Sequence, residues 1–137
     1  MDGMSGFFDP ELLAAVRIGV VERIDGPWFL KPMEKLGFSL DMSFGSAAGI
    51  TFGDLILVSK LGRVEPLPLP LLFHELVHVV QYRAHGVDGF ARGYVQGWWD
   101  NDRVYRAIPH EVEAYDYEDR YRRGERFIVC CELPEPG

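Results

Sequence analysis

The sequence is poor in cysteine and contains no long apolar run. Of its 137 residues only Cys130 and Cys131 are cysteines. Adjacent cysteines rarely pair because so short a ring strains a disulfide, and these two lack the C-x-x-C spacing of a zinc knuckle. No apolar run approaches the roughly 18 residues that span a bilayer, and no basic stretch typical of a secretory signal precedes the first apolar residues. We therefore expect a soluble, cytoplasmic protein with reduced thiols, one of them buried in a terminal strand, and no transmembrane segment.

Positive charge is also scarce, with 14 Lys and Arg against 21 Asp and Glu and a net charge of -7. A nucleic-acid partner requires a clustered positive field, so the composition argues against one. The basic residues near the C-terminus alternate with acids, which is typical of a solvated helix face with i,i+4 ion pairs. They are Arg120, Arg122, Arg123 and Arg126, interleaved with Glu118, Asp119 and Glu125.

The chain does contain enough apolar residues for one hydrophobic core. It is 47% hydrophobic and 26% charged, which is ordinary for a globular domain. A domain of this size buries roughly two-thirds of its unfolded surface and needs no disulfide. We expect a single domain over residues 1–137, with a core over about residues 10–131 and flexible tails at both ends.

Apolar spacing and turn residues predict an α+β fold. Asp9 is a suitable N-cap, with Pro10 at the first helical position, and Gly86 is a suitable helix stop. A run rich in β-branched residues around Gly53 predicts a strand, with that glycine at a bulge or turn. The predicted elements are helices over 10–24, 71–85, 89–99 and 109–123, a loop over 28–46, strands over 50–59 and 127–131, and a connection over 100–108.

Residues 74–78, within the second of these helices, are His-Glu-Leu-Val-His. Positions i and i+4 share one face of a helix, so His74 and His78 can bind one tetrahedral Zn²⁺ ion. Glu75 lies about 100° further around the axis, where it can accept a proton from a water on the metal without binding the metal itself. The flanking residues are almost wholly apolar, so this helix should be central and buried, and buried histidines need a partner. Gln81 lies near the same face and is expected to hydrogen-bond across the core.

A catalytic zinc site usually has three protein ligands and a water. The pattern HExxHxxGxxH does not supply the third ligand here, because Gln81 and Ala84 occupy the glycine and histidine positions. The remaining source is an acid from the helix over 109–123. We favour Glu111, which lies in the first turn with the small Ala114 three residues on. Glu113 is the alternative, since the two side chains point about 200° apart and only one can reach the metal.

The HELVHVVQ helix followed by an E-x-x-A helix resembles the gluzincin branch of the zincin metallopeptidases over about residues 50–123. More narrowly, it is similar to compact bacterial domains with a HELxHxxQ helix and a Pro-x-Glu-x-Glu-Ala-Tyr helix. The resemblance implies a zincin-like fold in which the HExxH helix packs on other helices and on a small β-sheet. In such a fold the segment TFGDLILVS would be the edge strand that holds a peptide substrate. The resemblance also implies His74, His78 and Glu111 as zinc ligands and Glu75 as general base.

The sequence departs from the gluzincin pattern at Tyr115, where many members carry an acid that orients a ligand histidine. Asp116 or a backbone carbonyl is expected to take that role. A peptidase also needs a group that stabilises the charge developing on the substrate carbonyl oxygen. The candidates for this oxyanion stabiliser are Tyr105, Tyr94, Tyr115 and His110.

We therefore predict a zinc-dependent metallopeptidase that acts on a peptide or protein substrate. One alternative is a non-catalytic interaction domain that keeps zinc as a structural staple. Another is a metal-free form of the fold in which hydrogen bonds satisfy the histidines. The presence of Glu75 favours the enzyme, because a structural zinc site has no need for a carboxylate at that position.

Overall fold

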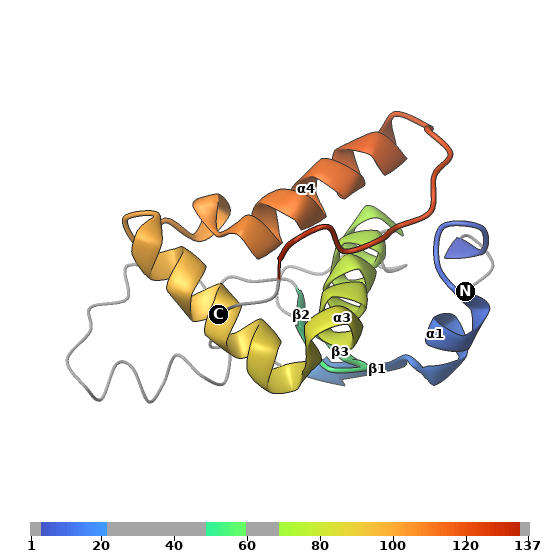
Figure 1. Cartoon of the computed structure of the whole chain (residues 1–137). Helices are drawn as coiled ribbons and strands as arrows, with labels where there is room; N and C mark the ends of the chain where they lie inside the picture. Colours follow the sequence, from blue (N-terminus) through green and yellow to red (C-terminus); the bar gives the residue numbers. More distant parts are fainter. Residues whose placement is uncertain (1–3, 22–48, 60–68, 135–137) are drawn as a thin grey trace.

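The computed structural model describes residues 4–21, 49–59 and 69–134, and its helices and strands make up a mixed α+β fold (Figure 1). The loop expected over 28–46 lies outside the described residues. Among the residues described, no helix is long and apolar enough to cross a membrane. The elements are α1 (Pro10–Ala15), β1 (Arg17–Val21), β2 (Gly49–Phe52), β3 (Leu55–Ser59), α3 (Leu69–Asp100), the 3-10 helix η3 (Tyr105–Ala107) and α4 (Pro109–Arg122).

The first helix is shorter than the apolar spacing predicts. Asp9 caps it by accepting a hydrogen bond from the Glu11 amide at 2.8 Å, but it ends at Ala15 instead of near residue 24. The backbone adopts an extended conformation at Val16. Residues 17–21 form β1, which pairs in parallel with β3. The prediction of a single helix was wrong because the following run of β-branched residues gains a strand partner 38 residues away in sequence.

The segment 50–59 forms two strands instead of the single predicted strand. β2 and β3 pair antiparallel across a tight turn, and Gly53 occupies that turn with φ of 60°, a conformation that favours glycine. The sheet order is β1-β3-β2, so β3 is central and β2 is an edge of the described sheet. Ile56 and Val58 on β3 are fully buried in the main core.

Helix α3 consists of two helical segments joined at Gly86, where φ is 74° and ψ is 168°. The predicted helix end at Gly86 and the separate helix that follows are therefore confirmed. In Figure 1 the first segment (green) lies between the sheet and α4, and the second (yellow) leads toward the start of α4. The first segment fills the main core because Phe73, Leu76 and Val77 have no exposed surface.

Both ends of the described chain differ from the sequence prediction. Met4, Phe7 and Phe8, which precede the expected start of the core, are buried within it. The predicted strand over 127–131 does not form. Among the described residues, the sheet contains no strand that pairs with this segment. The segment is instead held by a hydrogen bond from the Val129 amide to the Phe7 carbonyl at 2.8 Å.

The two thiols and the charged end of α4 both lie toward solvent. Both cysteines are free; Cys130 is exposed and Cys131 half-buried, so neither is the buried strand thiol that the sequence suggested. Ion pairs are present there, but only the pair of Arg122 and Glu118 has the expected i,i+4 spacing. They join Arg120 to Glu125, Arg122 to Glu118 and Arg123 to Glu125.

The second segment of α3 packs closely against the start of α4 at Gly97. A Cβ atom at this position would lie only 2.6 Å from Cδ of Pro109. The change Gly97→Ala is expected to destabilise the protein by about 1–2 kcal/mol, since this overpacking exceeds the helix propensity that alanine gains. Urea unfolding measures the effect, with the neighbouring exposed change Gln96→Ala as control. A stabilised Gly97→Ala protein would contradict this packing.

Candidate metal centre

Two buried histidines face α4 from the first segment of α3. His74 and His78 are one helical turn apart, and their ring centroids lie 5.0 Å from each other. Both are only 5% exposed, because the apolar residues around them place this helix between the sheet and α4. With Glu75, they form a group whose potential ligand atoms all lie within 4.8 Å of one another.

A carboxylate from α4 lies between the two rings. Glu111 Oε1 is 3.0 Å from Nε2 of His74 and 3.2 Å from Nε2 of His78. The other candidate, Glu113, is engaged elsewhere: its oxygens accept hydrogen bonds from the Gln81 side-chain amide and from the Glu132 backbone amide, both at 2.9 Å. Of the two acids, the structure therefore brings Glu111 to the histidines.

The outer nitrogen of each ring also has an acceptor. Nδ1 of His74 lies 3.0 Å from Oε1 of Glu118, and Nδ1 of His78 lies 2.7 Å from Oε1 of Gln81. The amide nitrogen of Gln81 donates to the His110 carbonyl and to Glu113, which fixes its oxygen toward His78. The expected hydrogen bond of Gln81 across the core is thus present. Glu118, and not Asp116, is the acid that orients His74.

These contacts test whether a metal fits. Both Nδ1 atoms donate, so each neutral ring would present the lone pair of Nε2 toward the Glu111 carboxylate. Two lone pairs facing an anion repel it unless protons or a metal cation lie between them. Two imidazole nitrogens and a carboxylate oxygen, each imidazole oriented by an outer acceptor, are a donor set that suits zinc. The residues fit a divalent metal.

The charges of the centre reflect the same arrangement. Burial alone would lower the pKa of His74, but its hydrogen bonds to Glu111 and Glu118 raise that pKa to about 10. Burial likewise opposes the charged form of His78, and the Glu111 carboxylate outweighs it and raises the pKa. Burial would raise the pKa of Glu111, but the two imidazoles lower it below its usual range. Without metal, His74 is therefore protonated at neutral pH, and its proton on Nε2 faces Glu111.

Metal uptake near pH 7 is expected to release protons. The pKa of His74 is raised to about 10 and that of His78 is raised as well, so protons must leave the imidazoles when a divalent metal ion enters. The affinity for zinc should accordingly rise with pH. Calorimetric titration in buffers of different ionisation enthalpy counts the protons. His85→Gln, which changes a histidine outside the centre, should leave the count unchanged, and uptake without proton release would contradict the proposed ligands.

Glu75 lies on the side of the helix that faces β2. Thr51 Oγ1 on this strand is 3.1 Å from Oε1 of Glu75, and a Cβ atom at Gly49 would come within 3.3 Å of Glu75 Cγ. Burial raises the pKa of Glu75, so this carboxylate binds a proton more readily than an exposed one. No sequence pattern points to Thr51 or Gly49, because their role depends on how the sheet packs on α3.

The expected oxyanion candidates are three tyrosines that contact Glu111 or His74 and one histidine that lies against Phe90. The hydroxyl of Tyr94 donates to Oε2 of Glu111 at 2.7 Å, and Tyr105 also interacts with Glu111. The ring of Tyr115 lies with its centroid 4.4 Å from that of His74. The fourth candidate, His110, is buried instead against Phe90, and its ring nitrogens have no hydrogen-bond partner among the described residues. Burial lowers the pKa of His110 to about 4, so the ring is neutral.

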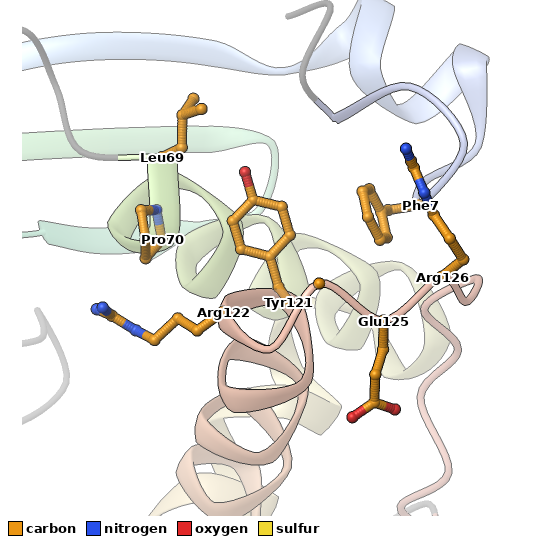
Figure 2. A pocket seen from close by; sticks show the side chains of 8 residues that line it. Phe7, Leu69, Pro70, Tyr121, Arg122, Glu125 and Arg126 are labelled. Atoms are coloured by element: carbon orange, nitrogen blue, oxygen red, sulfur yellow. The ribbon is translucent and has the colours of Figure 1, made fainter.

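A separate cavity of about 630 Å³ opens near the C-terminal end of α4 (Figure 2). Phe7 and Tyr121 form its aromatic side, with ring centroids 5.4 Å apart. Arg122 lines it and donates to Glu118 at 2.8 Å, while the other oxygen of Glu118 meets His74. The cavity contains none of the proposed metal ligands, so it is distinct from the centre.

Comparison of the chain with protein-family models, with curated proteins and with solved structures finds no match. The functional interpretation therefore depends on the geometry and chemistry of the centre.

Proposed function

We propose that the protein is a zinc-dependent metallopeptidase with a zincin-like fold. Its zinc ligands are His74, His78 and Glu111, and its general base is Glu75. The observation that carries this proposal is that Nε2 of both histidines converges on Glu111 while Nδ1 of both is held from outside. Such an arrangement presents a cation site, and a second buried carboxylate stands directly beside it.

The proposed reaction is hydrolysis of a peptide bond. A bound zinc ion would lower the pKa of a water molecule and polarise the substrate carbonyl. Glu75 takes a proton from the water while the water oxygen forms a bond to the carbonyl carbon of the substrate. As the carbon–nitrogen bond breaks, Glu75 gives this proton to the leaving nitrogen, so the products are a carboxylic acid and an amine.

The substrate is proposed to bind along β2. This strand is an edge among the described residues, and Thr51 places it in contact with Glu75. An extended peptide can add to such an edge through backbone hydrogen bonds. The strand expected to hold substrate is therefore β2, while β3, from the same predicted segment, lies inside the sheet.

Tyr105 is the proposed oxyanion stabiliser. Burial raises the pKa of its phenol, which keeps the proton available for donation at neutral pH. Both tyrosines interact with Glu111, but Tyr94 is buried, whereas Tyr105 is partly exposed and is the more accessible of the two to a substrate. In this assignment Tyr94 holds a metal ligand and Tyr105 stabilises the developing charge.

Removal and return of the metal tests the proposal. The purified protein is expected to bind about one zinc ion per chain and to cleave a mixture of unstructured peptides. A chelator should abolish cleavage, and added zinc should restore it. Detection uses mass spectrometry of the products and metal analysis of the same sample. Stoichiometric zinc without any cleavage would contradict a peptidase and favour a non-catalytic, zinc-stabilised interaction domain.

A further inference from the structure

An arginine stands at the edge of the proposed catalytic centre. Arg106 belongs to η3, directly before α4, and its side chain is exposed. Its guanidinium carbon lies 4.4 Å from the centroid of the Tyr115 ring. The same ring lies 4.4 Å from that of the proposed ligand His74. Arg106 is thus connected to the centre through a single aromatic side chain.

The charge of Arg106 is not neutralised by the described part of the chain. Its described contacts are the stacking and a hydrogen bond with Tyr115, and none is an ion pair. Five other arginines on α3, on α4 or just after α4 each have an acidic partner within 4.0 Å. They are Arg83, Arg92, Arg120, Arg122 and Arg123. In a chain with net charge -7, a cation left without an acid beside the centre is available to an anionic group of a ligand.

The acids of the centre are engaged in other contacts. Glu111 and Glu118 face His74, and Glu75 faces Thr51. The planar guanidinium matches a carboxylate in a two-point contact, and stacking on an aromatic ring restricts its orientation in advance. The group it suits best is therefore a carboxylate brought by the substrate.

We propose that Arg106 binds the free C-terminal carboxylate of a peptide substrate, so that the protein cuts peptide bonds near the C-terminus. This inference rests on the proposed peptidase function and adds its substrate class. Two ring contacts of 4.4 Å separate the guanidinium from the ring of His74. An extended peptide advances about 3.3 Å per residue, so a carboxylate on Arg106 places the scissile bond within roughly three residues of the chain end.

The test is a binding measurement that does not depend on turnover. Zinc-loaded Glu75→Gln protein is incubated with a library of acetylated tetrapeptides, supplied once as free acids and once as C-terminal amides. Mass spectrometry quantifies the retained peptides. The free acids should bind about tenfold more tightly than the amides, the usual size of one charge-assisted contact. In the additional Arg106→Gln variant this preference should disappear, and Arg106→Lys should retain part of it.

A matched control separates a local contact from general electrostatics. Arg103 carries the same charge three residues earlier and lies over Trp99 instead of Tyr115. Arg103→Gln should therefore keep the preference for free acids. Equal binding of acids and amides, or a preference that survives Arg106→Gln, would overturn the inference while cleavage by the wild-type protein still supports a peptidase. If neither library binds and the wild-type protein cleaves nothing, the proposed function itself fails and the inference falls with it.

Discussion

Replacement of Glu75 by glutamine is expected to lower kcat/KM for peptide hydrolysis by about a thousandfold. Glutamine has nearly the same shape, so it can occupy the space beside Gly49 and still meet Thr51. It cannot, however, accept a proton from water or deliver one to the leaving nitrogen. The loss should appear in kcat, because Glu75 is not proposed to hold the substrate.

The measurement pairs peptide cleavage with metal analysis on the same preparation. Glu75→Gln should retain about one zinc ion per chain, and the exposed change Glu125→Gln should affect neither property. Full peptidase activity in the Glu75→Gln variant would exclude Glu75 as the general base.

The same experiment tests an alternative set of metal ligands, in which Glu75 binds the metal. The ligand atoms of His74, Glu75 and His78 lie within 4.8 Å of one another, so Glu75 is also close enough to be considered as a ligand. We favour Glu111, since its carboxylate is within 3.2 Å of both Nε2 atoms, whereas Glu75 accepts a hydrogen bond from Thr51. Loss of zinc from Glu75→Gln would reverse this assignment.

The parts of the fold that depend on local sequence could be predicted. The HExxH helix and its end at Gly86 follow from a 3.6-residue apolar period and a glycine with positive φ. The last helix follows from Pro109 at its first position and from Gly124 after its end. These features need no knowledge of what the helices contact.

Features that depend on distant partners could not be predicted in the same way. The residues after Val16 fit a helical period, but β1 forms because β3 is available as a parallel neighbour. The segment 127–131 has the composition of a strand, yet it has no strand beside it among the described residues. In both cases tertiary pairing decided between local alternatives.

The residues that orient the proposed ligands also differ in whether the sequence could have identified them. Glu111 and Glu118 are seven residues apart and share a face of α4, a spacing that could have identified Glu118 as the partner of His74. The contact between Thr51 and Glu75 had no comparable signal, because it depends on the position of a sheet edge against α3. Ligand residues could therefore be proposed from sequence, while most of the residues that orient them required coordinates.

Replacement of Glu111 by glutamine is expected to weaken zinc binding by at least about 100-fold, more than the loss of a typical outer contact. The neutral amide keeps the size of the side chain but removes the anionic ligand between the two imidazoles. It also removes the carboxylate that Tyr94 contacts at 2.7 Å. Competition with a chromogenic chelator at fixed pH measures the affinity.

Glu113→Gln provides the matched comparison for Glu111→Gln, because it makes the same chemical change two residues later on α4. Glu113 contacts Gln81, which in turn holds His78, so its loss reaches the metal only through two hydrogen bonds. We expect zinc affinity to fall by less than about tenfold in this variant, below the range for direct partners of ligands. Since α4 can present only one of the two acids to the histidines, a larger loss in Glu113→Gln than in Glu111→Gln would mean that the helix is rotated about its axis relative to this structure, and the proposed ligand set would be wrong.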